Sequence, residues 1–335
     1  MIKKTIAYKL LRKLSWLKKH QVGYAVLTYH DIIPDEETDF SDPMKIKYSE
    51  FFKQMKMISD NFPIYSIKEL HKKIINKDIP KDLCVSITFD DGYLNQLSNA
   101  APLLQKLNIP ATFFITTDFA YQRIIPQLER WKSWIKLSQN KINLESIGIN
   151  ETFDLKNISE KRRLYNRLIG LLPSDIYDYE DDKLNSLLNK LFCDETIPRI
   201  YMNWKEINEL NKISNFTIGA HSVSHPNLKK VKNFLEDEVI KSKNIIESNI
   251  QQKVKYFAYP FGTNNELDKN IIDKMHVSNF DLAFSSILGL NQNPKSIYCL
   301  NRIAPLCNES ITIIKTKIYW SREIRKMKDV LNWKK

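Results

Sequence analysis

Short apolar runs alternate along this chain with amphipathic segments, and this alternation restricts the fold more than any other feature. The apolar runs, rich in β-branched and aromatic residues, are 24–29, 83–89, 111–116, 216–220, 256–259 and 282–285. Between them, apolar residues recur every three or four positions over 48–61, 66–76, 94–107, 233–248 and 265–276. The runs are typical of buried strands and the segments of amphipathic helices. Alternating strands and helices predict an α/β fold with a parallel sheet, either a barrel or a doubly wound sheet.

The chain is long enough for one large barrel with an insertion. Its 335 residues exceed the roughly 200–250 residues that a single α/β barrel commonly needs. The alternation breaks at about 120–200, where helices are predicted over 131–137, 160–172 and 182–191. We therefore expect a barrel domain over 21–314, interrupted by a helical insertion that either caps the barrel mouth or lies far from it.

The excess positive charge lies at the two ends of the chain. Of a formal net charge of +12, residues 1–20 carry +7 and residues 315–335 carry +6, which leaves −1 for residues 21–314. A nucleic-acid enzyme usually spreads basic residues over its working groove. The neutral body therefore argues against nucleic acid as a partner.

Both ends have the pattern of basic amphipathic helices. The apolar positions are Ile2, Ile6, Leu10, Leu14 and Leu17 at one end and Trp320, Ile324, Met327 and Leu331 at the other, with Trp333 beyond. Such helices suit an anionic membrane surface, although both stripes could equally pack on the barrel. We expect peripheral membrane contact as a hypothesis.

The sequence favours an intracellular, cytoplasmic location. No run reaches the roughly 18 apolar residues of a membrane span. Lysines and arginines interrupt residues 1–20 too often for a secretory signal. Four cysteines without a C-x-x-C pair fit a reducing compartment.

Two adjacent carboxylates follow the predicted strand 83–89, in Thr88-Phe89-Asp90-Asp91-Gly92. Like charges at a half-buried site repel, and a bound cation or a raised pKa on one group is the usual remedy. Successive side chains point in different directions, so one carboxylate can bind a metal while the other faces a substrate. The alternative is a solvated turn, because Asp-Gly is a common turn pair.

Two histidines follow the predicted strand 216–220, in His221-Ser222-Val223-Ser224-His225. Imidazoles four positions apart meet on one face if the segment turns helically, a spacing that lets both bind one metal ion. Two imidazoles and one carboxylate leave positions for water and substrate, as in catalytic zinc sites.

Together, TFDDG and HSVSH resemble the first two motifs of the polysaccharide deacetylases, the NodB-homology or carbohydrate esterase family 4 enzymes. The resemblance implies a distorted (β/α) barrel of the NodB-homology type. It further implies metal ligands at Asp91, His221 and His225 and a general base at Asp90. It covers about 24–120 and 214–304, and leaves the insertion and both termini outside.

A third motif of the family, often Arg-x-Pro-Tyr, is similar to Ala258-Tyr259-Pro260-Phe261-Gly262. This similarity implies an oxyanion-binding backbone N–H at Phe261, with Tyr259 and Pro260 beside the substrate. Ala258 stands where the family has an arginine that steadies the base. We hypothesise that Arg302, in Leu300-Asn301-Arg302-Ile303, supplies this guanidinium from another strand.

His30, which ends Val26-Leu27-Thr28-Tyr29-His30, resembles the family's Leu-x-His motif, whose imidazole protonates the leaving amine. That motif normally lies near the C-terminus, and no histidine follows His276. In the branch that acts on poly-β-1,6-N-acetylglucosamine the motif order is circularly permuted in this way. Asp281 resembles part of a further motif and is a candidate to orient His30.

These features predict a metal-dependent hydrolase that removes the acetyl group from an N-acetylhexosamine in a glycan, polysaccharide or lipid-linked sugar. Mixed imidazole and carboxylate ligands favour Zn²⁺, although Co²⁺, Ni²⁺ and Fe²⁺ bind the same set. One alternative is a non-catalytic carbohydrate-binding protein on the same fold, which the missing arginine at position 258 favours. The other is a non-haem iron oxygenase, which would need neither Asp90 nor His30.

Overall fold

The computed structural model describes residues 22–37, 42–78, 80–145, 149–170, 188, 197–292, 294 and 296–330. The chain divides into two compact units. We call the first the barrel unit; it comprises Met1–Asp35, Pro43–Tyr121 and Tyr201–Lys335. The second, the inserted unit, comprises Glu36–Asp42 and Gln122–Ile200.

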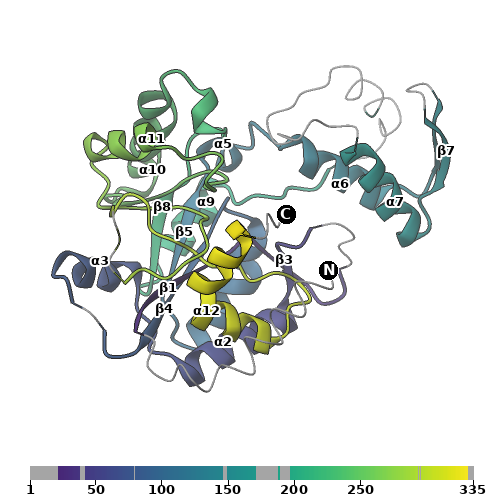
Figure 1. The fold of residues 1–335 in the computed structure, drawn as a ribbon. Helices are drawn as coiled ribbons and strands as arrows, with labels where there is room; N and C mark the ends of the chain where they lie inside the picture. Colours follow the sequence, from purple (N-terminus) through teal and green to yellow (C-terminus); the bar gives the residue numbers. More distant parts are fainter. Residues whose placement is uncertain are drawn as a thin grey trace. The chain divides into compact units, whose positions relative to one another are not determined.

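A six-stranded sheet forms the centre of the barrel unit, in the order β1-β4-β5-β8-β9-β10. Figure 1 labels four of these strands, β1, β4, β5 and β8. All neighbouring strands pair in parallel. Their residues are almost all buried, as parallel strands covered on both faces require. The strands are β1 (Gly23–Tyr29), β4 (Leu83–Phe89), β5 (Ala111–Ile115), β8 (Phe216–Ala220), β9 (Tyr256–Ala258) and β10 (Leu282–Phe284). Each lies on one of the predicted apolar runs.

A short extended segment, residues 300–303, bridges the two edge strands of this sheet. Leu300 pairs in parallel with Phe284 of β10, and Ile303 pairs in parallel with Leu27 of β1. The sheet therefore curls toward closure, and its architecture is the predicted distorted (β/α) barrel rather than an open doubly wound sheet.

Each of the five predicted amphipathic segments forms a helix beside the strands, whereas the helices Thr117–Ala120 and Trp204–Asn211 were not predicted. Capping boxes start two of them, since Ser66 pairs with Glu69 and Asn203 with Glu206. Two predicted helices begin as π-helical turns, which the pattern did not reveal. The principal elements are α2 (Tyr48–Asn61), α3 (Ile67–Ile75), η2 (Gln96–Ala100) continued by α4 (Ala101–Lys106), α5 (Thr117–Ala120), α9 (Trp204–Asn211), η6 (Leu235–Ile240) continued by α10 (Lys241–Ile250), α11 (Lys269–Lys274) and α12 (Ile311–Val330). A small parallel pair joins β2 (Asp31–Ile33) to β3 (Lys45–Lys47).

The inserted unit is not purely helical, which corrects the prediction. Helices α6 (Gln127–Leu137) and α7 (Ile158–Ile169) flank an antiparallel pair of strands, β6 (Lys141–Leu144) and β7 (Ile149–Asp154). In β6 exposed and buried residues alternate, a period-2 signal that is too short to stand out in a charged region. The predicted helix 182–191 lies, apart from Leu188, outside the described residues.

The described part of the C-terminal helix packs on the protein. Trp320 and Ile324 are 7% and 2% exposed and contact Leu288 and Tyr319. For these two residues the membrane-facing prediction is wrong, because protein covers the apolar stripe. Residues 1–20, and the side chains beyond Arg325, lie outside what the structure describes. Within the described chain, no helix combines the length and apolar character needed to cross a bilayer.

Candidate active site

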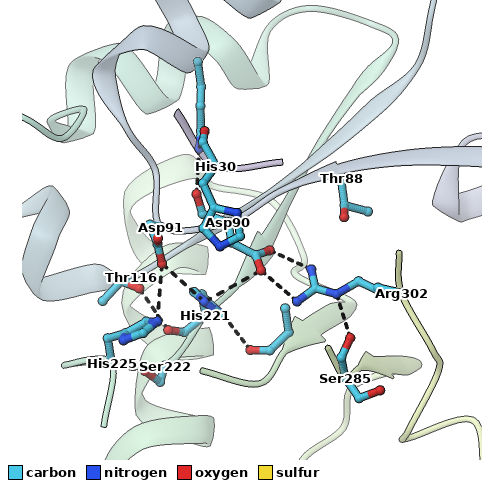
Figure 2. A network of polar contacts seen from close by, with 12 residues as sticks. His30, Thr88, Asp90, Asp91, Thr116, His221, Ser222, His225, Ser285 and Arg302 are labelled. Carbon is cyan, nitrogen blue, oxygen red and sulfur yellow. Dashed lines mark hydrogen bonds and ion pairs between the residues drawn. The ribbon is translucent and has the colours of Figure 1, made fainter. Parts of the chain in front are cut away.

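The C-terminal ends of the barrel strands bring most of the predicted site residues together (Figure 2). His30 follows β1, Asp90 and Asp91 follow β4, and His221 begins the loop after β8. Segment 300–303 adds Arg302 from the gap between the edge strands. Loops after parallel strands meet at one face of a barrel, where barrel enzymes carry their active sites.

Asp91, His221 and His225 point at one another. Nε2 of His221 and Nε2 of His225 each lie 3.4 Å from Oδ1 of Asp91. One ligand atom from each of the three residues lies within 4.8 Å of the others. Nδ1 of His221 lies 2.8 Å from the carbonyl oxygen of Ala258, so this nitrogen carries the proton and Nε2 faces Asp91.

This arrangement fits a divalent cation. Oδ1 of Asp91 is buried and has no hydrogen-bond partner among the described residues. With Nδ1 of His221 bonded to a carbonyl oxygen, either a proton or a metal ion must lie between Nε2 and the carboxylate. Two imidazole nitrogens and one carboxylate oxygen are the ligand types of catalytic zinc sites.

The electrostatics of the cluster agree with this fit. Burial disfavours the charged form of Asp91, but His221 and His225 outweigh burial and lower the pKa of Asp91 below its usual value. Burial lowers the pKa of His225 to about 4, although Asp91 opposes the shift, so His225 is neutral at pH 7. Burial acts in the same direction on His221, but Asp90 and Asp91 outweigh it and raise the pKa of His221. The raised pKa favours the protonated form of His221, and a metal ion would compete with that proton.

Asp90 is held by a buried arginine. Nη1 and Nη2 of Arg302 donate to Oδ1 and Oδ2 of Asp90, both at 2.7 Å, and Nε donates to the carbonyl oxygen of Ser285 at 2.8 Å. Burial disfavours the charged Asp90, but Arg302 and then His221 outweigh it, so the pKa of Asp90 lies below its usual value. Ala258 has no guanidinium to contact Asp90, and Arg302, from the segment that bridges the sheet edges, makes this contact instead.

His30 lies beside both carboxylates. Figure 2 shows the Asp90 carboxylate between the His30 ring and the Arg302 guanidinium. His30 is among the residues that lower the pKa of Asp90 and of Asp91. Nδ1 of His30 is buried and finds no hydrogen-bond partner in the described chain.

The structure corrects the prediction for Asp281. This residue precedes β10, whereas His30 follows β1, so the two lie at opposite ends of a parallel sheet. Oδ2 of Asp281 instead lies 3.6 Å from Nδ1 of His71 and 3.5 Å from Nζ of Lys255. Asp281 therefore does not orient His30.

The predicted substrate contacts of Tyr259 and Pro260 are also wrong for their side chains. Tyr259 is fully buried, and its hydroxyl donates to the carbonyl oxygen of Tyr298 at 2.8 Å. Pro260 is buried as well. Phe261 does reach the site, because its ring packs edge-on against His225 with 4.7 Å between centroids.

The backbone makes two tight turns at the site, one centred on Asp91 and one on Phe261. Asp91 and Phe261 have φ values of 73° and 56°. In each turn the residue after the centre donates to the carbonyl oxygen of the residue before it, with Gly92 bonded to Asp90 at 3.0 Å and Gly262 to Pro260 at 2.5 Å. This form of γ-turn is rare and strained in non-glycine residues, and such strain concentrates at functional sites.

Glu238 holds the histidine loop, and the sequence motifs did not reveal it. Its carboxylate accepts the backbone N–H groups of Val223 and Ser224 at 2.8 and 2.9 Å, and the hydroxyl of Ser224 at 2.7 Å. Ser222 adds a hydrogen bond from the N–H of His225 to its hydroxyl, at 3.0 Å. The only sequence signal was a charged residue three positions after Leu235, on the apolar face of the predicted helix.

Comparison with known proteins finds a family match that includes these motifs. A family model described as polysaccharide deacetylase matches residues 77–151 and 188–280. YxkH of Bacillus subtilis (strain 168), which is named for the same activity, is 30% identical over 139 residues. The alignment covers 41% of this chain and 46% of YxkH, so it spans about half the length of this curated relative.

Solved structures share the fold. The deacetylase PplD of Streptococcus pyogenes, solved in complex with acetate, matches 90% of this chain and 99% of its own, with a TM-score of 0.58 and 16% identity. IcaB from Ammonifex degensii matches 90% of this chain and 98% of its own, with a TM-score of 0.55 and 17% identity. The deacetylase domain of BpsB from Bordetella bronchiseptica matches 85% and 96%, with a TM-score of 0.52 and 13% identity. At these identities the likeness establishes the fold alone, and it confirms the predicted barrel.

Proposed function

Because this chain belongs to the polysaccharide deacetylase family, we propose that it is a metal-dependent hydrolase that removes the acetyl group from an N-acetylhexosamine of a glycan. One observation carries the proposal: a carboxylate held by an arginine lies next to a cluster of candidate metal ligands. Oδ2 of Asp90 lies 4.0 Å from Nε2 of His221, whose ring also faces Asp91. A base and a Lewis-acid site side by side suit the attack of water on an amide carbonyl.

Asp91, His221 and His225 would hold one divalent ion. Zn²⁺ is expected because imidazole and carboxylate ligands are mixed, and Co²⁺, Ni²⁺ or Fe²⁺ suit the same ligands. When bound, such an ion polarises the acetyl carbonyl and makes a nearby water molecule a stronger acid.

Asp90 takes the proton of the attacking water. A general base must be ionised and within hydrogen-bond reach of the proton it removes. The bidentate pair with Arg302 meets the first condition, because it lowers the pKa of Asp90. The same pair fixes the direction of the carboxylate, since Arg302 is itself anchored on Ser285.

His30 protonates the departing amine, and the backbone of Phe261 stabilises the oxyanion. The closeness of His30 to both carboxylates supports its assignment as the acid, because acid and base must reach the same scissile bond. The positive φ of Phe261 sets the direction of its peptide groups beside His225. One well-placed oxyanion donor contributes about 3–4 kcal/mol to such a reaction.

The non-catalytic alternative loses the observation that motivated it, and the oxygenase alternative leaves part of the site unexplained. The non-catalytic hypothesis began from the arginine missing at Ala258, and Arg302 now provides that contact with Asp90. An oxygenase would make no use of this ion pair or of His30.

Acetate release tests the proposal. Metal-free protein would be loaded separately with Zn²⁺, Co²⁺, Ni²⁺ and Fe²⁺ and incubated with soluble, polymeric and lipid-linked N-acetylhexosamine glycans. We expect acetate from at least one class of glycan, in a metal-dependent way, and none from Asp91→Ala. Metal-loaded protein that binds a glycan but releases no acetate would instead favour the non-catalytic alternative.

We also propose that the seven basic and no acidic residues of 1–20 favour peripheral contact with an anionic membrane. The buried Trp320 and Ile324 limit what α12 can add. Sedimentation with anionic and neutral liposomes, at low and high salt, tests this contact. Binding that survives deletion of 1–20 would exclude that segment as the anchor.

A further inference from the structure

One side-chain amide joins the ends of the two strands that carry the proposed acid and base. Nε2 of Gln96 donates to the carbonyl oxygen of His30 at 3.0 Å and to that of Asp90 at 2.6 Å. Gln96 is fully buried, and both partners are acceptors, so only the amide nitrogen can face them. We infer that Gln96 is a positioning residue that sets the spacing between His30 and Asp90; this inference rests on the proposed function.

Gln96 acts where the strand pairing ends. Strands β1 and β4 are paired up to Tyr29 and Phe89, and the N–H of Asp90 still donates to the carbonyl oxygen of Tyr29 at 3.0 Å. Beyond this bond the chain turns at Asp91, so no further ladder bond can hold the two strand ends. The amide of Gln96 supplies the next cross-link.

Two neighbours of Gln96 hold the residues that follow His30. Nδ2 of Asn95 donates to Oδ1 of Asp31 at 2.9 Å, and Nδ2 of Asn99 donates to the carbonyl oxygen of Ile32 at 2.7 Å. Asn95, Gln96 and Asn99, which we call the amide clamp, therefore fix three consecutive residues after β1. Asn99 follows Asn95 by four positions and Gln96 by three, so it lies on the same helix face as each of them.

Gln96 and Asn99 of the clamp lie in the π-helical turn η2, and Asn95 directly precedes it. The N–H of Ala101 donates to the carbonyl oxygen of Gln96, one residue further back than in an α-helix. The extra residue rotates the clamp relative to α4, whose Leu103 and Leu104 are buried in the core. One continuous helix thus turns amides toward the strand ends and apolar side chains toward the core.

The ring of His30 depends on this main-chain support. Its buried Nδ1 has no hydrogen-bond partner in the described residues, and Asp281 lies at the other end of the sheet. The direction of the imidazole therefore follows from where the backbone of His30 is held. A misplacement of about 1 Å at a reacting group can cost about 10²-fold in rate.

A mutant cycle tests whether Gln96 acts through the acid and the base. Gln96→Met keeps the length and burial of the side chain but cannot donate to either carbonyl. We expect kcat to fall roughly 10- to 10²-fold with KM and metal content unchanged. In the His30→Ala and Asp90→Asn backgrounds the same change should cost much less, because the groups it positions are already lost. An undiminished loss in both backgrounds would overturn the inference.

Gln54→Met is the matched control. Gln54 is also a buried glutamine, 1% exposed, but its Oε1 accepts the hydroxyl of Tyr29 at 2.9 Å, and within the described chain its side chain bonds to no site residue. We expect a comparable loss of thermal stability with kcat retained. An equal fall in kcat for both variants would show that Gln96 matters only for stability. If Gln96→Met does not fold, Asn99→Ala removes one clamp bond, and its effect on kcat should likewise shrink in the His30→Ala background.

A readout without substrate separates this inference from the proposed function. Histidine-ring NMR, with the His30 signals assigned from His30→Ala, should show the His30 resonances shifted in Gln96→Met and those of His71 and His276 unmoved. A wild-type protein that releases no acetate would contradict the proposed function alone. Unmoved His30 resonances would overturn the positioning by Gln96, whatever the activity.

Discussion

Arg302 and Asp90, 212 positions apart in the sequence, form a buried bidentate ion pair with two 2.7 Å contacts. The pair exists because residues 300–303 bridge the edges of the sheet and bring Arg302 to the C-terminal ends of the strands. Burial alone would raise the pKa of Asp90, and this pair is the largest influence that instead lowers it below its usual value.

Replacing Arg302 should therefore damage both catalysis and stability. In Arg302→Met, burial of Asp90 is opposed only by the neighbouring histidines, so the pKa of Asp90 should rise. The ionised base then disappears at a higher pH, and the acidic limb of the kcat/KM profile should move upward, with a lower maximum. An uncompensated buried charge should also cost about 3–5 kcal/mol in the free energy of unfolding.

Arg302→Lys is the control that separates the positive charge from the bidentate geometry of the ion pair. Lysine keeps the positive charge but cannot form the bidentate pair. Its pH profile should lie between those of the wild type and Arg302→Met. Identical profiles for wild type and Arg302→Met would refute the assignment of Asp90 as a base held by Arg302.

Metal content should separate the ligands from the acid and the base. Asp91→Ala, His221→Ala and His225→Ala should lose bound metal and activity together, because each removes one of three ligands. Asp90→Asn and His30→Ala should keep the metal and lose about 10²–10⁴-fold in kcat. Elemental analysis of the purified variants measures the metal content. An unchanged metal content in His221→Ala would refute the ligand assignment.

The sequence predicts the strands well because parallel strands are buried on both faces and read as continuous apolar runs. All strands of the central sheet follow this rule, for example β4 with its seven buried residues. The inserted strands fail it, since β6 has four residues that alternate between exposed and buried. An alternation over only four residues is too short to stand out as a strand signal.

The clustering of side chains that follow strand ends, such as Asp91 and His221, was predictable from the sequence. Positioning groups such as Gln96 and Glu238 were not, because a polar residue within a helical pattern reads as a solvated one until the packing is known. Asp281 failed for a geometric reason: a residue before a strand lies at the other end of the sheet from one that follows it. Its similarity to a motif contained no information about which end it occupies.

The stability of the barrel unit should depend on pH through Glu247. Its carboxylate accepts Nζ of Lys253 and the N–H of Val254, both at 2.9 Å. Burial opposes the charged form, but these two contacts outweigh it and lower the pKa of Glu247 below its usual value. A lowered folded pKa contributes stability above the unfolded value of about 4.3, and the contribution is lost as pH falls through the folded value.

Glu247→Gln should therefore lower Tm at pH 7, and the difference from wild type should shrink as the pH falls below about 4. Thermal unfolding of both proteins between pH 3 and 7 measures this difference. Lys253→Met removes one of the two contacts and should have a smaller effect of the same sign. A Tm difference that stays constant over this range would show that the charge of Glu247 is not involved.

Glu238 should control metal affinity without touching the metal. In Glu238→Ala, two backbone N–H groups and the hydroxyl of Ser224 lose their acceptor, and the loop between His221 and His225 loses its fixed shape. Groups that orient metal ligands typically account for 10–100-fold in affinity, so we expect the Kd for Zn²⁺ to rise by about that factor.

Two further variants serve as comparisons. Glu238→Gln keeps one acceptor oxygen, and its Kd should lie between those of the wild type and Glu238→Ala. Glu247→Ala is the control and should leave the Kd unchanged. It removes a carboxylate of the adjoining helix α10 whose partners among the described residues, Lys253 and Val254, lie outside the site. Titration of metal-free protein with Zn²⁺ against a competing chelator measures these values, and a Kd for Glu238→Ala equal to that of Glu247→Ala would show that the loop needs no such support.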